Sequence, residues 1–337
     1  MNLTYRDVLN DLETGRIKTG IEGTNKKSWL KYCYHFSHIE NIISILKDGE
    51  LLARSEAIRL ERMVSDNASE KIIQITNPQH KDYVRLYFRP KSPTQFHNEG
   101  FKTAQQLRIS SLDAQCPVPV FLFFNIEKVL NYPESLFSEK SLASNEKVDL
   151  YNTPEEFSKL PFDKIYHDQK MTQNERDSIV GHRHAEIVIP NRFYIDEFLE
   201  KIVVRSPAEK ETLLSLMDKN LKQKYSHLVQ IDSTQNVFFN RWTYFYEVSL
   251  YSEGLELELR LSLEPNNNKP IQFDLEFEFE FDNGYTPVKN HKLSNWLAKP
   301  EIKLKFQSPK ENYRVRIKFD GYLMYSGVYK KEENIPF

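Results

Sequence analysis

A short run with two histidines and a glutamate has the highest density of chemically versatile side chains in this sequence. Residues 181–189 read Gly-His-Arg-His-Ala-Glu-Ile-Val-Ile. If they form a strand, His182, His184 and Glu186 point the same way, because alternate residues of a strand share a face. Two imidazoles and a carboxylate suit zinc or iron, although no further ligand pair with matching spacing occurs in the sequence.

Two other interpretations of this run involve no metal. Glu186 could be a carboxylate at the start of a buried strand, where it would stabilise the positive charge that develops on a sugar when a glycosidic bond breaks. Alternatively, the three residues could form the polar edge of a strand. All three interpretations stay open at this point.

Several common catalytic scaffolds are excluded. The chain has only ten glycines and contains neither Gly-x-Gly-x-x-Gly nor Gly-x-x-x-x-Gly-Lys-Ser/Thr, so Rossmann and P-loop phosphate sites are absent. Gly-x-Ser-x-Gly, His-Glu-x-x-His and an acidic calcium loop are also missing. The two cysteines, Cys33 and Cys116, provide neither a disulfide framework nor a four-thiolate metal site.

Charge and composition indicate a globular protein of about two domains. The 337 residues include 46 Lys and Arg against 48 Asp and Glu, and 39% are hydrophobic, which excludes disordered, collagen-like and coiled-coil chains. No apolar run reaches the roughly 18 residues that span a bilayer. The first residues lack the basic and apolar blocks of a signal peptide. We therefore expect a cytoplasmic protein that does not contact membranes.

Two helices have clear start signals. Ser37 and Glu40 form a Ser-x-x-Glu capping box, followed by apolar residues at helical spacing as far as Gly49. A second box begins at Ser206 and opens a helix through Met217. Apolar runs between these helices predict a mostly buried sheet, with strands at 72–75, 83–88, 119–124, 185–189 and 202–204. The long polar stretches 54–71 and 145–183 favour substrate-covering loops.

From Leu228 onward the sequence alternates strictly between apolar and charged residues. The alternating runs are 255–261, 273–281, 302–306 and 315–319, and turn signals separate them. This pattern predicts an antiparallel β-sandwich or half-barrel with solvated charged faces. We therefore predict two domains, 1–227 and 228–337.

Five ordered segments resemble the DarT-type nucleic-acid ADP-ribosyltransferase toxins. Residues 34–52 resemble the opening motif Tyr-His-x-Thr/Ser-His-x-x-Asn and the following Ile-Leu-x-x-Gly-x-Leu. Residues 82–93 resemble Asp-Tyr-Val-Pro-Phe-Tyr-Phe-x-Pro-Arg-Ser-Pro, 119–122 the central strand, 136–139 Val-Phe-Thr-Asp, and 184–189 the catalytic signature Gln-Ala-Glu-x-Leu-Val. The likeness covers Tyr34 to about Ser206, and the C-terminal strands have no counterpart in the short family members.

This resemblance implies an α+β fold. Its core would be an ADP-ribosyltransferase-like split mixed β-sheet with short helices, followed by an all-β sandwich-like C-terminal domain. The implied activity is that of a toxin-like, NAD-dependent ADP-ribosyltransferase of the glycosyltransferase class, which modifies a nucleobase in single-stranded DNA or RNA and releases nicotinamide. The family favours DNA. An antitoxin with a macrodomain is the expected protein partner, in a toxin-antitoxin or anti-phage setting.

The resemblance also assigns residues. Glu186 would contact the nicotinamide ribose as the catalytic carboxylate, while His35 and Ser37 would hold NAD and Tyr87 would pack near the nicotinamide. The segment 167–183 would grip the acceptor, and 54–71 would cover NAD.

Two positions depart from the family pattern. His184 stands where the family has Gln, and a histidine that titrates near neutral pH could accept a proton from the attacking group. The basic pair that the family carries on its cofactor loop is missing, which leaves Arg54, Arg62 and Lys71 as the basic candidates for cofactor binding.

Basic and aromatic residues alternate around residue 87. Arg85, Arg89 and Lys91 interleave with Tyr83, Tyr87, Phe88 and Phe96, a mixture that can bind phosphates and stack bases. A single-stranded substrate is expected, because a paired base must be flipped out before it can enter a pocket. Alternatives are ADP-ribosylation of RNA or protein, a 2'-phosphotransferase, a nucleic-acid-binding module without turnover, and a metal-dependent hydrolase using His182, His184 and Glu186.

Overall fold

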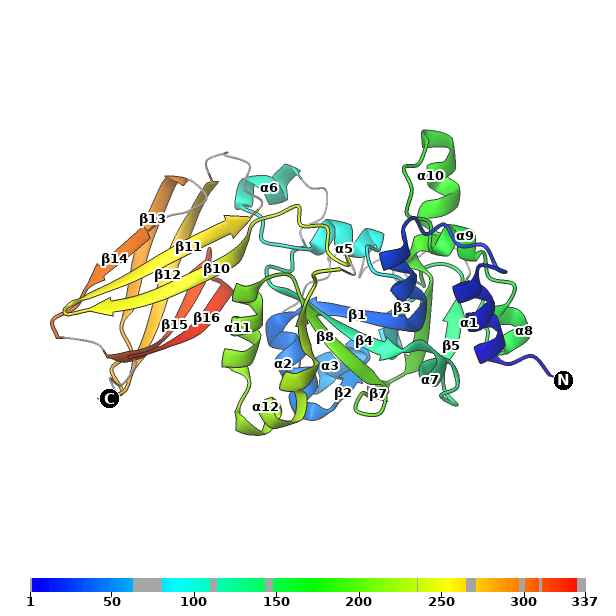
Figure 1. The fold of residues 1–337 in the computed structure, drawn as a ribbon, viewed down its shortest axis with the longest axis horizontal. Helices are drawn as coiled ribbons and strands as arrows, with labels where there is room; N and C mark the ends of the chain where they lie inside the picture. Colours follow the sequence, from blue (N-terminus) through cyan, green and yellow to red (C-terminus); the bar gives the residue numbers. More distant parts are fainter. Residues whose placement is uncertain are drawn as a thin grey trace.

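The computed structural model describes residues 2–62, 81–109, 114–142, 148–234, 236–264, 271–296, 301–308 and 311–331 (Figure 1). The elements before residue 150 are α1 (Tyr5–Thr14), η1 (Thr24–Lys31), β1 (Tyr32–His38), α2 (Ile39–Asp48), β2 (Glu50–Leu52), α3 (Arg54–Arg59), β3 (Tyr83–Tyr87), α5 (Pro93–Asn98), α6 (Ala104–Ile109), β4 (Pro119–Asn125), α7 (Ile126–Leu130) and β5 (Leu136–Ser138). They are followed by α8 (Pro154–Phe157), α9 (Phe162–Ile165), α10 (Gln173–Val180), η3 (His182–His184), β6 (Glu186–Pro190), β7 (Arg192–Tyr194), β8 (Leu199–Val204), α11 (Pro207–Leu216), α12 (Lys219–Tyr225), η4 (Ser226–Leu228) and β9 (Val229–Ile231). The C-terminal strands are β10 (Tyr244–Glu253), β11 (Glu256–Glu264), β12 (Ile271–Phe281), β13 (Val288–Trp296), β14 (Glu301–Lys305), β15 (Asn312–Phe319) and β16 (Tyr322–Lys330).

The larger sheet has seven strands in the order β5-β6-β3-β1-β4-β8-β9. It is mixed, because β8 and β9 pair in parallel while the other neighbours are antiparallel. β1 pairs with β4 along its whole length, from Tyr32↔Asn125 to His38↔Pro119, but its ladder with β3 consists of the single pair Tyr34↔Tyr87. The sheet is therefore split between β3 and β1, as the sequence predicts for this class of fold.

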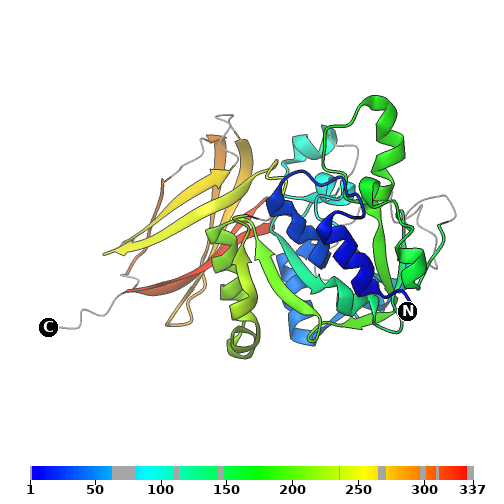
Figure 2. The ribbon, with the colours of Figure 1, turned by 45° about the vertical axis from the view of Figure 1, so that its right-hand side comes forward.

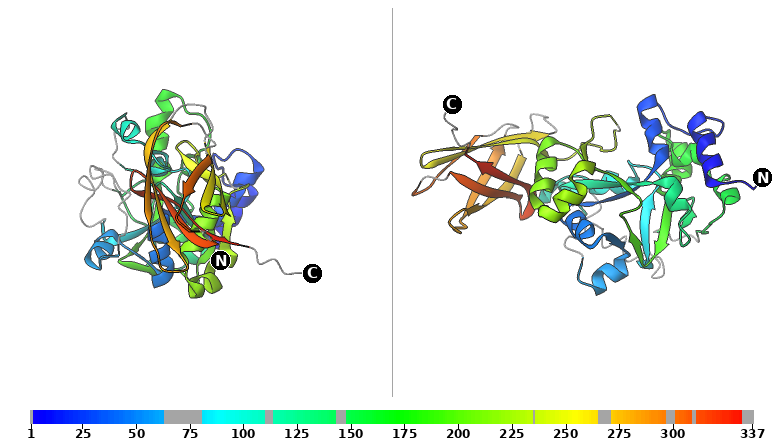
Figure 3. Two further views of the ribbon diagram at one scale, coloured as in Figure 1. Left: turned by 90° about the vertical axis from the view of Figure 1, so that its left-hand side faces the viewer. Right: turned by 60° about the horizontal axis from the view of Figure 1, so that its bottom comes forward.

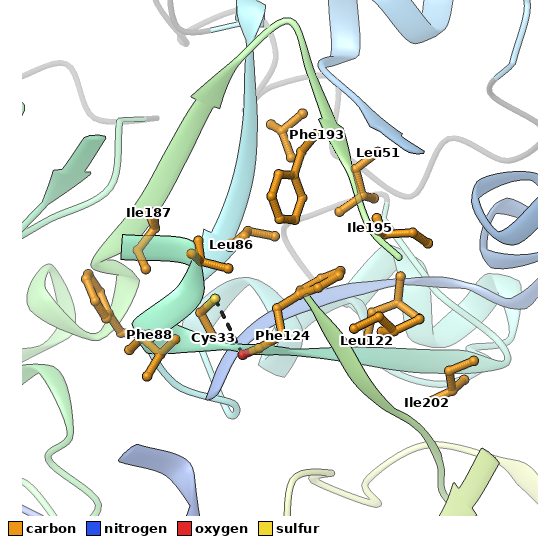
Figure 4. Close-up of a cluster of buried hydrophobic side chains, with 14 of the residues drawn as sticks. Cys33, Leu51, Leu86, Phe88, Leu122, Phe124, Ile187, Phe193, Ile195 and Ile202 are labelled. Carbon is orange, nitrogen blue, oxygen red and sulfur yellow. Dashed lines mark hydrogen bonds between the residues drawn. The ribbon is translucent and has the colours of Figure 1, made fainter. Parts of the chain in front are cut away.

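Each face of this sheet is covered by apolar side chains. One face carries the larger cluster, where Leu86, Leu122 and Ile187 point toward Phe193 of β7 (Figure 4). Burial of so many aliphatic and aromatic side chains is the main driving force for this fold. The opposite face carries Tyr34, Phe121 and Phe123, and it is covered by Val237 and Phe238 from the segment after β9.

The C-terminal strands form two antiparallel sheets that pack face to face. One has the order β10-β11-β14 and the other β13-β12-β15-β16 (Figure 1). Leucines of β11 and phenylalanines of β12 share one buried cluster, because alternate residues of each strand point inward. The sequence predicted this sandwich from the alternation alone. A division into domains at residues 227 and 228 stays a prediction, and β9, at 229–231, pairs within the larger sheet.

Helix α11 lies between the sandwich and the larger sheet in Figures 1 and 2 and in the right view of Figure 3. Buried hydrogen bonds attach it to the sandwich. The Ser206 hydroxyl donates to the Phe245 carbonyl at 2.6 Å, and the Ser215 hydroxyl donates to the Ser326 carbonyl at 2.9 Å. The Ser326 amide donates to the Thr212 hydroxyl at 3.1 Å. Both partners of each bond must be placed accurately, so these bonds fix the sandwich against α11, next to the larger sheet.

The helix after β1 is present, but its predicted capping box is wrong. Ser37 still belongs to β1, and its hydroxyl accepts a hydrogen bond from Nδ2 of the Asn41 side chain at 3.2 Å. His38 is the N-cap instead, with Nδ1 accepting from the Glu40 amide at 3.4 Å. Gly49 ends the helix at a φ of 70°, as predicted.

The second capping box is half formed. The Ser206 hydroxyl accepts from the Glu209 amide at 3.2 Å, as predicted. The Glu209 carboxylate does not return to the N-cap, because it is buried against the Arg205 guanidinium, with Nε 2.8 Å from Oε1.

Short helices occupy the described parts of the two stretches that we predicted to be loops, and residues 63–71 and 145–147 of these stretches lie outside the described residues. Residues 54–59 form α3, and the stretch 145–183 contains α8, α9 and α10. The strand predicted at 72–75 lies outside the described residues. None of the described helices is long and apolar enough to cross a membrane.

Candidate active site

Glu186 is the first residue of β6 and its side chain is fully buried. Its Oε1 accepts a hydrogen bond from the Leu142 amide at 2.6 Å and lies 3.8 Å from Nη1 of Arg85. Glu186 stands opposite Tyr87 of β3 and Ser138 of β5. Directly paired residues present their side chains on the same face, so the carboxylate lies in a row between a tyrosine and a serine.

The two histidines before Glu186 do not share a strand face with it, and that prediction is wrong. Residues 182–184 form the short 3-10 helix η3, so the strand begins only at Glu186. Nδ1 of His182 lies 3.0 Å from the Glu139 carbonyl, whereas Nδ1 of His184 lies 3.4 Å from the Thr94 hydroxyl. Within the described residues, no group of three or more His, Cys, Asp or Glu side chains could hold a metal ion.

His184 does not titrate near neutral pH. Burial, with smaller contributions from His97 and Arg85, lowers the pKa of His184 to about 4. A cation loses hydration when it is buried, so the neutral imidazole is favoured. His184 is therefore neutral at physiological pH, and our prediction of a group titrating near neutrality is corrected.

His35 is also held neutral. Its Nδ1 lies 3.3 Å from the carbonyl of Arg85, and burial lowers the pKa of His35 to about 4. A carbonyl oxygen only accepts hydrogen bonds, so Nδ1 must carry the proton. The neutral ring then has a lone pair on Nε2, which can accept a hydrogen bond. The predicted NAD-binding role of His35 stays a prediction.

Arg85 connects the two ends of the predicted site. Its carbonyl contacts His35 of β1, and its guanidinium approaches Glu186 of β6. The three residues thus come from three adjacent strands, β1, β3 and β6. We had predicted Arg85 to contact nucleic acid, whereas here its charge lies beside the candidate catalytic carboxylate.

Tyr87 lies at the only point where β3 pairs with β1. It stands opposite Tyr34 on one side and Glu186 on the other. Burial and the nearby Glu186 charge raise the pKa of Tyr87, and a hydrogen bond with Thr94 opposes that shift. The phenol therefore stays protonated, and its ring lies beside the carboxylate. Packing of Tyr87 near the nicotinamide stays a prediction.

The other predicted cofactor residues lie on the side of α2 and α3. The Ser37 hydroxyl contacts Asn41, and Arg54 is the half-buried first residue of α3. Arg62 forms an ion pair with Asp48 at the end of α2. Lys71 lies outside the described residues.

Arg89 is not available to nucleic acid, so that prediction is wrong. Its side chain is 2% exposed. The guanidinium donates to the carbonyls of Pro90, Ile165 and His167 and lies over the Trp29 ring. Arg89 therefore fixes the chain ahead of α10. In contrast, Lys91 is half-buried near the surface, where its Nζ donates to Oδ1 of Asn236 at 2.6 Å.

In the segment 167–183, which we expected to grip the acceptor, the two ends contact each other. The Arg183 guanidinium lies 2.9 Å from Nδ1 of His167 and donates to the Gln169 carbonyl at 3.3 Å. Helix α10 lies between these two ends in the sequence and extends away from the sheet (Figure 1). This arrangement gives the segment a fixed base directly before η3 and Glu186.

Two contacts of the site were missed by the sequence analysis. Thr94 touches both His184 and Tyr87, and Leu142 contributes the amide that holds Glu186. The Ser92-Pro93 helix start gave a signal for α5, since Ser92 caps it. A backbone amide has no signal in residue type, so nothing in the sequence indicated Leu142.

The fold and the row of residues around Glu186 define the class as an ADP-ribosyltransferase-like α+β fold with a β-rich C-terminal region. A sequence model of the family described as ssDNA thymidine ADP-ribosyltransferase, DarT, matches residues 34–239. This match covers more than half of the chain, and the chain belongs to the DarT family. It is an NAD-dependent ADP-ribosyltransferase that acts on DNA, with NAD as its co-substrate.

Solved structures of DarT from Thermus sp. 2.9 are similar to this chain. The complex with ADP-ribosylated ssDNA is 20% identical, covers 62% of this chain and 96% of its own, and has a TM-score of 0.48. The complex with NAD+ is 19% identical, covers 62% and 98%, and has a TM-score of 0.47. No curated protein matches the chain.

Proposed function

We propose that this protein transfers ADP-ribose from NAD to a thymidine base of single-stranded DNA and that Glu186 is its catalytic carboxylate. The family description supplies the acceptor. The observation that carries the residue assignment is the double contact of Arg85, which reaches His35 with its carbonyl and Glu186 with its guanidinium. These contacts link the NAD-binding candidate and the catalytic candidate through one residue, Arg85, at the split of the sheet, and they support the assignment of both to one site.

In the proposed reaction, the bond between ribose C1'' and the nicotinamide nitrogen breaks, and the nicotinamide leaves with the bonding electrons. A bond forms between C1'' and an atom of the base, and the base loses a proton to solvent or to a nearby acceptor. The Glu186 carboxylate stabilises the positive charge that develops on the ribose. The Leu142 amide fixes that carboxylate in place, so it need not reorganise during the reaction.

His184 takes the position of the family's Gln. As a neutral imidazole it contacts Thr94 through Nδ1, so its hydrogen bonding resembles that of an amide side chain more than that of a cation. We infer that His184 positions the acceptor base by hydrogen bonding. His184→Gln should then retain transfer to thymidine with an unchanged pH profile. Loss of transfer in that variant would instead support proton transfer by the imidazole.

The proposed biological role is that of a toxin, in a toxin-antitoxin or anti-phage setting, with an antitoxin that removes the modification. Support for this role comes from the family alone. Expression of the wild-type chain should arrest bacterial growth, and Glu186→Ala should relieve the arrest. Equal growth arrest by both proteins would contradict the proposal.

The acceptor can be identified with labelled NAD. The label on the ADP-ribose should appear on single-stranded DNA that contains thymidine. It should not appear on DNA of the same length without thymidine, on RNA, or on proteins of a cell extract. Transfer to RNA alone or to protein alone would overturn the proposed acceptor while leaving the NAD chemistry in place.

A further inference from the structure

An arginine and two phenylalanines form a partly exposed cluster beside the candidate active site. The Arg241 guanidinium lies 3.7 Å from the centroid of the Phe96 ring, whose residue is 38% exposed. Phe96 meets the Phe239 ring edge-on, with 5.2 Å between centroids. On the far side, Nζ of Lys91 lies 5.7 Å from the centroid of Phe239. We call Lys91, Phe96, Phe239 and Arg241 the aromatic platform.

The platform is built from two segments that hydrogen bonds hold together. The buried Glu99 carboxylate accepts from the amides of Phe239 at 3.0 Å and Asn240 at 2.7 Å. Nε2 of Gln95 donates to the Val237 carbonyl at 2.8 Å. A carboxylate that accepts several backbone N–H bonds is a strong anchor. Segment 236–241, which leads into the sandwich, is thereby fixed against α5 and its end.

Helix α5 connects the platform to the catalytic residues. Its residue Thr94 contacts His184 and Tyr87, while Phe96 and His97 are exposed two and three positions further along. His97 is also close enough to His184 to lower its pKa. The His97 ring in turn meets the Phe96 ring edge-on, with 5.4 Å between centroids. A strand whose base reaches His184 can therefore pass over His97 onto the platform.

The two cations of the platform, Lys91 and Arg241, form no direct ion pair with a carboxylate among the described residues. The charge of Glu99 acts on both cations from further away, and those of Asp168 and Asp232 act on Lys91. Elsewhere, Arg260 also lies over an aromatic ring, that of Tyr251, but it pairs with Glu258 and Glu301. Partly exposed rings beside cations that have no directly paired carboxylate fit a polyanion with stacking groups, which is single-stranded nucleic acid.

We propose that the aromatic platform binds nucleotides that flank the modified base, so that the segment leading into the sandwich is part of the DNA-binding surface. One base stacks on Phe96 or Phe239, and Arg241 and Lys91 contact adjacent phosphates. This inference deepens the proposed function and rests on it for the identity of the strand. A peptide ligand is the competing occupant, and its binding would not depend on nucleotide length.

The test measures DNA binding separately from catalysis. The protein carries Glu186→Gln, so that the probe is not modified, and the probe is a fluorescent thymidine-containing oligonucleotide of about 12 nucleotides. Fluorescence anisotropy should show that Arg241→Ala or Phe96→Ala weakens affinity about tenfold. Arg241→Gln should also reduce the slope of log affinity against log salt by about 0.7, the value for one phosphate contact on a single strand. Arg260→Ala, the matched control, should change neither quantity.

A second experiment compares the KM values for oligonucleotides of two lengths. With active protein, Arg241→Ala should raise the KM for the long oligonucleotide and leave the KM for one of about 3 nucleotides unchanged, because the short strand does not reach the platform. Equal affinity of wild type and Arg241→Ala, or an equal loss on both lengths, would overturn the inference. Absence of transfer by the wild type to any DNA would refute the proposed function, while platform-dependent binding of the probe would still support the platform.

Discussion

The transferase sheet and the sandwich handle charge in opposite ways. On the sandwich, charges alternate along exposed strand faces and pair across strands, as Lys318 does with Glu276 at 3.1 Å and with Glu278. In the transferase region, Glu186 and Arg89 are buried, and neutral backbone groups supply most of their hydrogen bonds. Exposed pairs contribute little to folding, whereas buried charges are costly unless they are held tightly. We infer that function and folding determine the buried charges of the transferase region, whereas solubility determines the exposed charges of the sandwich.

The largest effect on stability is expected from the buried arginine. Arg89→Ala leaves the carbonyls of Ile165 and His167 without their donor and Asp168 without a charge 3.6 Å away. We expect a loss of about 3–5 kcal/mol in the free energy of unfolding, measured by urea denaturation. The matched sandwich variant Arg314→Ala, which removes an exposed pair with Glu280, should cost less than about 1 kcal/mol. Similar costs for the two variants would erase the contrast between the regions.

Acid should destabilise the protein through its buried histidines. Burial lowers the pKa of His38 to about 4 in the folded protein, against 6.5 for the free side chain. Above pH 6.5 both states are neutral and stability is complete. As the pH falls from 6.5 toward 4, only the unfolded state takes up the proton, so stability is lost by at most about 3 kcal/mol. His38→Asn, which keeps an N-cap acceptor, should make the urea midpoint depend less on pH across this range, and His35 and His184 should account for the dependence that remains. An unchanged pH dependence in that variant would exclude His38 as a cause.

The joint between the regions should show an intermediate effect. Thr212→Val keeps the shape of the side chain but leaves the buried Ser326 amide without its acceptor. We expect a loss of about 2 kcal/mol in the free energy of unfolding, and Thr212→Ser should restore most of it. Wild-type stability of the valine variant would mean that this hydrogen bond does not anchor the sandwich.

The smallest effect is expected on the charged face of the sandwich. Lys318→Met removes the cation between Glu276 and Glu278. Thermal denaturation should show a change of less than about 1 kcal/mol, and this change should shrink as salt is added. Transfer activity should be unaffected. A large, salt-independent loss would show that this face is covered by a partner or by another part of the chain.

The sequence predicted elements wherever periodicity and local chemistry agree. The alternation in 255–261 and 315–319 led directly to β11 and β15, and the apolar spacing after Ile39 led to α2. Ser206 capped its helix as expected. These features depend on neighbours within a few residues, so a single sequence contains the information.

The errors in the sequence-based predictions arose where contacts between residues far apart in the sequence determine the structure. Residues 182–184 alternate like a strand, but Gly181 stays in the helical region and continues α10 into η3. Arg89 resembled a phosphate ligand because its partners, the carbonyls of Ile165 and His167, are far away in the sequence. The pKa of His184 depends on burial by residues that no local pattern identifies. Glu186 itself was predicted through the family resemblance, and its catalytic role stays a prediction.

The central claim is that the buried carboxylate of Glu186 drives transfer of ADP-ribose. The most direct measurement compares wild type with Glu186→Gln in the release of nicotinamide and in the attachment of labelled ADP-ribose to a thymidine-containing single strand. Glutamine keeps the acceptor for the Leu142 amide and removes the charge. We predict a rate lower by a factor of about 10² to 10³, with urea stability no lower than that of the wild type. Transfer at the wild-type rate by a folded Glu186→Gln protein would contradict the account.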